Sequence, residues 1–329
     1  MPDRKPFLDL VAERVVVMDG AIGSALQERT DLELERDWMG QENMSEVLNL
    51  TRPDVIAEIH RGFLQIGCDA VETNSFGGNR IVMAEADMVD RAYEVSKLAA
   101  EIARKTCDEF ETSDRPRYVI GSAGPGTKIA SLGNTHWDEM EASYLDNLRG
   151  LIDGGADVLL TETAQDLLQI KIFLSAAEKA FDACGRRLPV MVQASFDLNN
   201  GANMLTGPDP ETFVATFVPY WERGEIDVLG VNCAYGPQEL ADAVQTIARL
   251  WPGRVSVLPN AGMPIMVDGQ SHFPLQPGDF AEGVMRFVND FGVDIVGGCC
   301  GTKVPHLDAL IQRLGDKGPL GSGRAVATA

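Results

Sequence analysis

Short apolar runs alternate with longer amphipathic stretches along almost the whole chain of 329 residues. Eight runs are predicted as strands, at residues 15–18, 70–73, 118–122, 158–161, 190–194, 228–231, 255–259 and 294–296. Helical spacing predicts helices at residues 53–66, 90–109, 137–153, 166–183, 210–221, 237–250, 277–291 and 305–314. Because strands and helices alternate eight times, the pattern favours an α/β fold, a (β/α)8 TIM barrel.

The alternative fold for this pattern is a doubly wound open sheet. It is disfavoured because no GxGxxG turn follows the first strand and no composition break divides the chain. We therefore expect one barrel over residues 1–314, and a disordered tail over 315–329, which is rich in glycine and alanine. The stretch 27–50 is long for a strand-to-helix connection, and such loops are usually functional or flexible.

Composition narrows the class of partner. The chain has 28 basic and 49 acidic residues and a net charge of −21, which argues against nucleic acid and against anionic membrane surfaces. No apolar stretch reaches membrane-spanning length, and no signal-type region follows the charged first residues. We therefore expect a cytoplasmic protein, in which thiols stay reduced. Cys68, Cys107 and Cys184 are interpreted as packing residues.

A barrel predicts that chemistry lies just after the strands, at their C-terminal ends. Cys233 ends the sixth strand, Cys299 and Cys300 follow the eighth, and Asn260 follows the seventh between them. Three thiols so placed can bind one zinc ion and leave its fourth position open, as catalytic zinc sites do. The alternative is that they are packing residues or half of a structural site, but no fourth Cys or His lies at a usual spacing.

Several segments at the strand ends match a known family. They read MDGAIG at 18–23, NLTRPD at 49–54, ETNSF at 72–76, GGAD at 154–157, VNC at 231–233, PNAG at 259–262 and GGCCGT at 297–302. With these segments the chain resembles the zinc-dependent homocysteine S-methyltransferases, most closely the homocysteine-binding module of cobalamin-dependent methionine synthase. The resemblance covers about residues 14–314 and implies a (β/α)8 barrel, in agreement with the strand pattern.

The resemblance implies that Cys233, Cys299 and Cys300 bind zinc and that the homocysteine sulfur becomes the fourth ligand. It places Asn260 beside the zinc, where it fills the fourth position when substrate is absent; the alternative is a loop asparagine that bonds only backbone. Asn232 is expected to support its neighbour Cys233.

The polar groups of homocysteine need partners as well. Asp19 and Glu162 match the positions that meet the ammonium group, although Asp19 could also cap the following helix. Gly20 and Gly23 would let backbone N–H groups approach the carboxylate. Further candidates for binding substrate are Glu72 and Ser122, although Glu72 could equally orient the loop 74–80.

The methyl donor implied by the resemblance is methylcobalamin on a separate corrinoid protein, because the folate, cobalamin and activation modules of the full enzyme have no counterpart in this chain. Relatives that act alone use betaine or S-methylmethionine. A quaternary ammonium needs an aromatic cage, but the two tyrosines of the betaine enzyme correspond to Gly77 and Thr163, and only Trp38 could supply a ring. A non-catalytic homocysteine or zinc sensor, or another thiol as acceptor, also remains open.

Overall fold

The structure is a computed structural model that describes residues 4–267 and 270–315. Eight parallel strands form one sheet in the order β1-β10-β7-β6-β5-β4-β3-β2. These strands are β1 (Val16–Val17), β2 (Ala70–Glu72), β3 (Tyr118–Ala123), β4 (Val158–Ala164), β5 (Val190–Ala194), β6 (Val228–Asn232), β7 (Arg254–Leu258) and β10 (Ile295–Val296). A parallel bridge between Met18 and Ala70 joins the first and last strands of this order. The predicted (β/α)8 TIM barrel is confirmed, and the open sheet is excluded.

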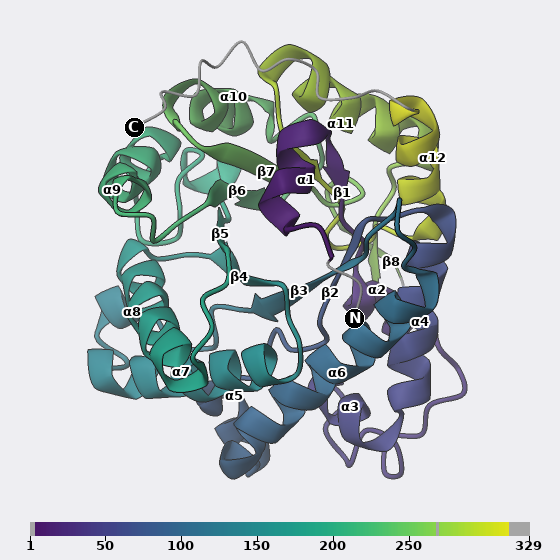
Figure 1. Cartoon of the computed structure of the whole chain (residues 1–329), viewed down its shortest axis with the longest axis vertical. Coiled ribbons are helices and arrows are strands. Elements are labelled where there is room, and N and C mark those ends of the chain that lie inside the picture. The colour runs from purple at the N-terminus through teal and green to yellow at the C-terminus, as the bar shows by residue number, and fades with distance from the viewer. Residues whose placement is uncertain (1–3, 268–269, 316–329) are drawn as a thin grey trace.

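Helices surround the strands (Figure 1). They are α1 (Phe7–Glu13), α2 (Ile22–Gln27), α3 (Leu48–Thr51), α4 (Pro53–Ile66), α5 (Arg80–Met83), α6 (Ala92–Phe110), α7 (Trp137–Asp153), α8 (Leu167–Cys184), α9 (Pro210–Glu222), α10 (Ala241–Leu250), α11 (Pro277–Phe291) and α12 (Val304–Leu314). The predictions for α4, α7 and α11 match to the residue. The prediction for α10 began four residues early, because residues 237–240 form a turn before the helix.

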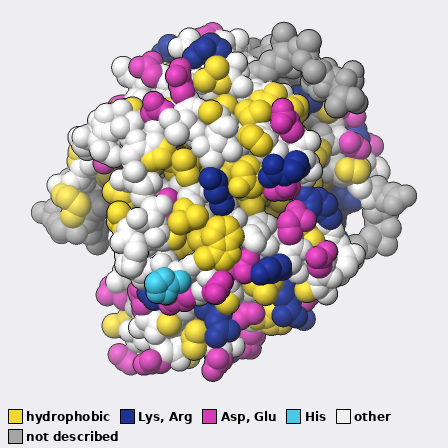
Figure 2. Space-filling model, turned by 90° about the vertical axis from the view of Figure 1, so that its left-hand side faces the viewer, with side chains coloured by type: hydrophobic (Ala, Val, Ile, Leu, Met, Phe, Trp, Pro, Cys, Tyr) yellow, Lys and Arg dark blue, Asp and Glu magenta, His cyan; other side chains and the backbone are white. Residues whose placement is uncertain are grey.

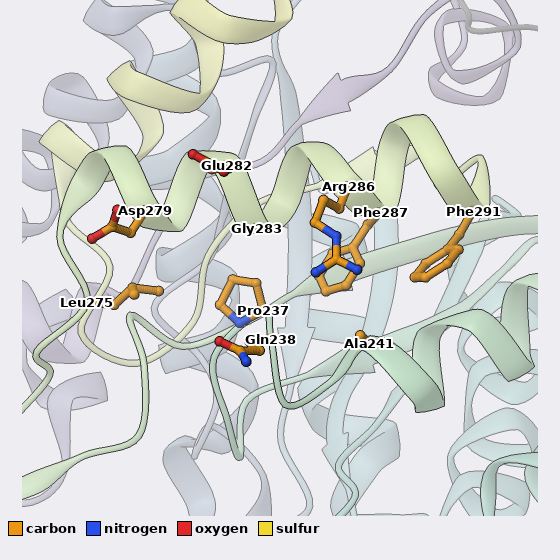
Figure 3. Close-up of a pocket in the computed structure, with 10 residues that line it drawn as sticks. All are labelled: Pro237, Gln238, Ala241, Leu275, Asp279, Glu282, Gly283, Arg286, Phe287 and Phe291. Atoms are coloured by element: carbon orange, nitrogen blue, oxygen red, sulfur yellow. The ribbon is translucent and has the colours of Figure 1, made fainter.

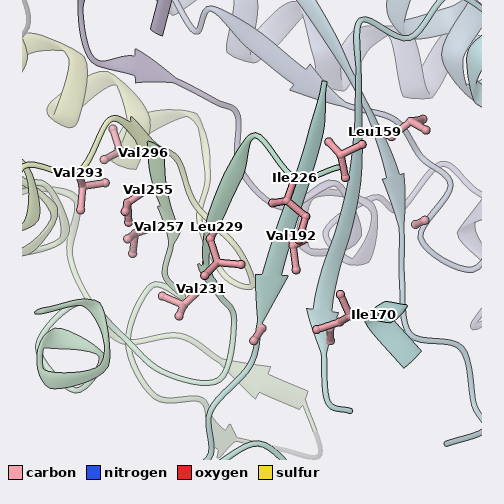
Figure 4. Close-up of a cluster of buried hydrophobic side chains, with 14 of the residues drawn as sticks. Leu159, Ile170, Val192, Ile226, Leu229, Val231, Val255, Val257, Val293 and Val296 are labelled. Carbon is pink, nitrogen blue, oxygen red and sulfur yellow. The ribbon is translucent and has the colours of Figure 1, made fainter. Parts of the chain in front are cut away.

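Two apolar cores lie on the two faces of the sheet, as alternating side chains require. Val158 and Leu160 of β4 belong to the core inside the barrel. Leu159, between them, belongs to the larger core under the helices. Figure 4 shows members of the larger core on β4 to β7, including Leu159 and Val192. These strands are buried on both faces, as is usual for a parallel barrel.

Helix α1 covers the N-terminal end of the barrel, in front of the strands in Figure 1. Phe7, Leu10 and Val11 are buried and join the core inside the barrel. The ring of Phe7 meets that of Tyr118 edge-on, with centroids 5.2 Å apart. Sequence analysis did not predict α1. Because this end is closed, a ligand reaches the interior from the C-terminal end.

The stretch 27–50 packs on the loop after β2. It holds a short 3-10 helix, Ser45–Val47. The Asn49 amide donates to the Asn74 carbonyl at 2.8 Å, and the Asn74 amide donates to the Ser45 carbonyl at 2.8 Å. The Gly77 N–H donates to Glu46 Oε1 at 2.5 Å. These bonds hold the stretch at the C-terminal rim of the barrel.

A second small sheet, missed by sequence analysis, lies between β7 and α11. It pairs β8 (Ile265–Val267) with β9 (Gln270–His272) in antiparallel fashion. The predicted tail, apart from Gly315, lies outside the described residues. No helix among the described residues is long and apolar enough to cross a bilayer.

The face shown in Figure 2, over α8 and α9, mixes acidic, basic and apolar side chains. Exposed ion pairs are frequent in the described residues, for example Arg187 with Glu178 on α8. Exposed pairs of this kind each stabilise a fold by less than about 1 kcal/mol. The stability of the barrel therefore comes mainly from its two apolar cores.

Candidate metal and substrate site

The three predicted thiols meet at the C-terminal end of the barrel. Cys233 follows β6, while Cys299 and Cys300 follow β10. Their sulfur atoms all lie within 4.8 Å of one another, and the sulfurs of Cys233 and Cys300 are 3.7 Å apart. Within residues 4–267 and 270–315, this is the one group of three or more Cys, His, Asp or Glu side chains able to hold a metal ion.

Backbone bonds between neighbouring strand ends hold the three cysteines in place. The Cys233 N–H donates to the Leu258 carbonyl at 3.0 Å, and the Cys299 N–H donates to the Pro259 carbonyl at 2.8 Å. Cys233 has a positive φ of 60°, which only a well-braced residue adopts. After the cysteines the chain turns at Gly301, where φ is 77° and a Cβ would collide with the ring of Phe273. Glycine is therefore required there.

The donor set and its spacing suit a thiolate-binding metal. Four sulfurs arranged tetrahedrally at the usual Zn–S distance lie about 3.8 Å from one another, close to the 3.7 Å between Cys233 and Cys300. Three soft thiolates select zinc, copper(I) or iron–sulfur centres over magnesium or calcium. The residues present thus fit such an ion with one position left over.

Asn260 lies beside the thiols, two residues after the end of β7. Its side chain hydrogen-bonds the sulfur of Cys233, which lowers the pKa of that thiol, although the contacts with Cys299 and Cys300 lower it more. Its Oδ1 is buried and has no hydrogen-bond partner among the described residues. An unpaired buried amide oxygen is costly, so this atom is a candidate ligand for a metal ion held by the thiols. The placement predicted for Asn260 beside the thiols is found.

Hydrogen bonds among the three thiols make their pKa values unequal. The pKa of Cys233 falls well below its ordinary value, because its neighbours donate S–H hydrogen bonds to it. The same contact with Cys233 raises the pKa of Cys300 to about 12 and that of Cys299 well above the usual range. The three thiols therefore hold their protons with unequal strength. Binding of a metal ion releases the remaining protons.

Three predicted acids converge beside the thiols. Asp19 follows β1, Glu72 ends β2 and Glu162 lies near the end of β4. Asp19 Oδ1 accepts the Glu72 N–H at 3.1 Å, and the Ser122 hydroxyl donates to Glu162 Oε1. Asp19 Oδ2 and Glu72 Oε1 are buried without a hydrogen-bond partner in the described part of the chain. The four predicted side chains thus form one polar floor.

Burial makes this floor a poor place for negative charge. Desolvation, together with the neighbouring acids, raises the pKa values of Asp19 and Glu72 well above their usual range. Desolvation raises that of Glu162 to about 7, against the opposing hydrogen bond from Ser122. Buried acids of this kind are satisfied by a cation. The floor therefore suits a ligand with an ammonium group.

Asn232 lies between the acids and the thiols. Its amide nitrogen lies 3.1 Å from Glu162 Oε2 and 3.8 Å from the sulfur of Cys299. We expected Asn232 to support Cys233; the sulfur that its side chain contacts is that of Cys299. The spacing of residues in the sequence held no signal for this contact.

The two predicted glycines have different surroundings. A Cβ at Gly20 would lie 2.8 Å from Thr302 Oγ1, so Gly20 is needed to pack the loop after β10 against the loop after β1. A Cβ on Gly23, in α2, would meet no atom within 4 Å. Open space for a ligand therefore adjoins Gly23, whereas Gly20 is enclosed by protein.

A separate groove of about 380 Å³ lies on the outer wall, between α10 and α11 (Figure 3). Arg286, Phe287 and Phe291 line it on the α11 side, and Pro237 and Ala241 on the other. It contains none of the predicted site residues. The candidate chemistry thus remains at the C-terminal end of the barrel.

Comparison with known proteins agrees with this geometry. The model of the homocysteine S-methyltransferase family matches residues 16–314. Methionine synthases of Mycobacterium tuberculosis and Mycobacterium leprae are each 40% identical over 301 residues, which is 92% of this chain but 25% and 24% of those proteins. The chain thus spans about a quarter of the length of the curated relatives it matches.

Solved structures show the same fold. The metallated form of the homocysteine methyltransferase MmuM from Escherichia coli gives a TM-score of 0.70 at 21% identity, over 91% of this chain and 96% of that one. Its oxidized form gives 0.69 with the same identity and coverage. The family match covers both the barrel and the strand ends that bear the thiols and acids. The chain belongs to the homocysteine S-methyltransferase family.

Proposed function

We propose that the protein transfers a methyl group to the thiol of homocysteine and forms methionine. The observation that carries this proposal is the cluster of Cys233, Cys299 and Cys300 at the open end of the barrel. It is supported by the family match over residues 16–314. A protein in which these thiols stay reduced fits the cytoplasm, which we keep as its predicted location.

Zinc is the metal that we propose for the three thiols, and a relative of the same fold has a metallated form. A zinc ion with an open position lowers the pKa of a bound thiol and holds its sulfur as a nucleophile. Cys233, Cys299 and Cys300 would bind the ion, and Asn260 would occupy the remaining position until substrate replaces it. The protein's part is to hold these donors with their sulfurs within 4.8 Å of one another.

The acids provide the site for the substrate's ammonium group. Asp19 and Glu162 would accept its N–H bonds, and Glu72 adds a third carboxyl group to the same buried floor. Ser122 holds Glu162 in place through Oε1. An ammonium group satisfies the unpaired oxygens of Asp19 and Glu72, which supports an amino acid rather than a simple thiol as acceptor.

The substrate's carboxylate would lie near the start of α2. The space beside Gly23 is open, and a bare glycine lets a ligand approach the backbone closely. Gly20 would act through packing, since it brings the loop after β1 against Thr302. The two glycines thus have separate parts in our proposal.

For the methyl donor we propose methylcobalamin carried by a corrinoid protein. A betaine cage is disfavoured, because a side chain at position 77 would meet Glu46 Oε1 at 3.1 Å, and Thr163 has no ring. Trp38 packs into the apolar clusters of the 27–50 stretch. No aromatic cage can be assembled from these positions.

The exposed apolar side chains at the rim of the barrel favour a large methyl donor that is carried by a partner protein. Nine of the eleven exposed large apolar side chains in the described residues lie on the connections that run from β1, β2, β3, β5 and β7 to α4, α5, α7, α9 and α11, and a tenth, Trp137, is the first residue of α7. These ten, called the apolar rim below, are Leu34, Met39, Phe76, Leu132, Trp137, Leu198, Leu205, Met263, Ile265 and Met266. Exposed apolar groups concentrated on one end of a protein are typical of a docking face. A small donor would need no such rim.

The test is methionine formation by zinc-loaded protein and homocysteine with methylcobalamin, S-methylmethionine or betaine in separate reactions. Product from methylcobalamin alone is expected. Product from S-methylmethionine or betaine would overturn the proposal that methylcobalamin is the donor, and would place the protein with the relatives that act alone. Homocysteine binding without product from any donor would favour a sensor. The Cys300→Ser variant, which lacks one thiol, is the matched control and should form no product.

A further inference from the structure

Asn232, the last residue of β6, is 1% exposed and lies where the ends of β4, β6 and β10 meet. We propose that Asn232 is a positioning residue: its amide N–H couples the binding of the substrate's ammonium group at Glu162 to the sulfur of Cys299. This inference rests on the proposed function. It adds a link between the two halves of the site, the acid floor and the thiol cluster.

The contacts of one planar amide define the link. Asn232 Oδ1 accepts the Thr163 N–H at 2.7 Å. Asn232 Nδ2 lies 2.9 Å from Thr163 Oγ1, 3.1 Å from Glu162 Oε2 and 3.8 Å from Cys299 Sγ. Because an amide group is rigid, these contacts fix the three neighbours relative to one another.

The first effect is to hold an irregular strand end. β4 shifts its register against β5 between Thr161 and Ala164. Within that irregularity Thr163 has a φ of 53°, which is unfavourable for a β-branched residue. Asn232 bonds both the N–H and the hydroxyl of Thr163, so it stabilises this conformation. Such bulges re-aim neighbouring side chains, here Glu162 toward the site.

The second effect follows from counting hydrogens. The amide nitrogen has two N–H bonds but three acceptors within reach, on Thr163, Glu162 and Cys299. When an ammonium group binds Glu162, it satisfies Oε2, and an Asn232 N–H becomes available to the sulfur of Cys299. A hydrogen bond to a metal-bound thiolate withdraws electron density from it. Binding of the substrate's ammonium group would thus change the electron density on the sulfur of Cys299.

The experiment compares homocysteine with 4-mercaptobutanoate, which has the same thiol and carboxylate but no ammonium group. Binding of each to the zinc-loaded protein is measured by calorimetry, without any methyl donor. We expect Asn232→Ala to weaken homocysteine binding about tenfold and to leave 4-mercaptobutanoate within about twofold. Asn232→Leu keeps the side-chain volume but donates no hydrogen bond, and it should change the two affinities in the same way as Asn232→Ala. Asn147→Ala, a buried asparagine on α7 bonded to Ser96, is the matched control and should change neither affinity.

Two further measurements separate coupling from mere structure. In the cobalt(II)-substituted protein, homocysteine should shift the thiolate-to-cobalt absorption of the wild type and shift it less in both Asn232 variants. In a Glu162→Gln background, Asn232→Ala should add no further loss of preference for homocysteine. If the Asn232 variants bind both ligands more weakly by the same factor, so that the ratio of the two affinities is unchanged, the proposal is overturned.

Failure of this inference is distinguishable from failure of the proposed function. A wild-type protein that binds neither metal nor homocysteine would contradict the proposed function itself. A wild type that binds both, with Asn232 variants that keep the wild-type preference and cobalt response, would contradict only the link. Thermal unfolding of each variant checks that it remains folded.

Discussion

The sulfur atoms of Cys233 and Cys300 lie 3.7 Å apart, although 67 residues separate them in the sequence. Strand β7 lies between β6 and β10 in the sheet, and the loops that follow the two outer strands meet beyond its end. The separation is that of two ligands on one tetrahedral ion, about 3.8 Å at the usual Zn–S distance. The barrel therefore holds these two sulfurs at the separation expected of two ligands of one zinc ion.

Loss of one thiol should remove the metal. We expect Cys300→Ser to lower the zinc content from about one ion per chain to well below half after dialysis, because thiolate is the stronger donor. Cys184→Ser is the control, since Cys184 lies at the end of α8 outside the cluster. Metal analysis of the purified proteins gives the result. Full zinc content in Cys300→Ser would contradict the proposed ligand set.

The two glycines should separate folding from binding. Gly20→Ala should lower the free energy of unfolding by about 1–3 kcal/mol, because the new Cβ collides with Thr302. Gly23→Ala should keep or raise stability by up to about 1 kcal/mol, because alanine favours a helix. The same Gly23 variant should bind homocysteine roughly tenfold more weakly, since its methyl group enters the open space. Chemical denaturation and calorimetry measure both; wild-type affinity in Gly23→Ala would refute the carboxylate position.

A charge on the apolar rim should impair use of the donor and leave binding of the acceptor intact. Met263→Asp is expected to raise the KM for methylcobalamin at least threefold, because the carboxylate must be desolvated when the cofactor docks. Leu250→Asp, exposed at the end of α10 and off the rim, is the control. Steady-state kinetics at saturating homocysteine provides the comparison. Equal KM values in the two variants would remove the support that the rim gives to a carried donor.

Buried His60 should make the fold sensitive to acid. It lies in α4, and neither ring nitrogen has a hydrogen-bond partner among the described residues. Burial lowers its pKa from 6.5 to about 4. The unfolded chain therefore binds the proton more tightly, and stability is lost as the pH falls from 6.5 toward 4 and levels off below. The loss from this group is on the order of 3 kcal/mol.

His60→Leu removes this group and should flatten the dependence of the unfolding free energy on pH between 6.5 and 4. Urea denaturation at several pH values measures the slope. His136→Leu is the control for losing an exposed histidine, at the start of α7. A slope in His60→Leu as steep as that of the wild type would show that other groups cause the acid sensitivity.

The barrel was predictable because its strands are buried on both faces and its helices are amphipathic, so each element carries a local signal. The helix α1 and the β8–β9 pair were missed for different reasons. The charged start of the chain obscured α1. The strands β8 and β9 are too short to carry a periodic pattern, and the only signal for them in the sequence is the Asp-Gly pair at 268–269, which is typical of a hairpin.

The site was predictable where chemistry and motif coincide, and less so where contacts cross the barrel. The three cysteines and Asp19 follow strands, and Glu162 lies near the C-terminal end of β4, as barrel chemistry requires. The contact of Asn232 with Cys299 depends on how two distant strand ends approach each other, which no local pattern encodes. The bond between Glu46 and Gly77 likewise joins two loops, and it gives the physical reason why position 77 has no side chain.

The most direct test of the account is the set of atoms bound to zinc before and after homocysteine is added. X-ray absorption at the zinc edge of the loaded protein counts these atoms. We predict three sulfurs and one oxygen or nitrogen without substrate, and four sulfurs with homocysteine. An unchanged set of three sulfurs at saturating homocysteine, or fewer than three sulfurs without it, would contradict the claim that these thiols hold the metal that activates the substrate.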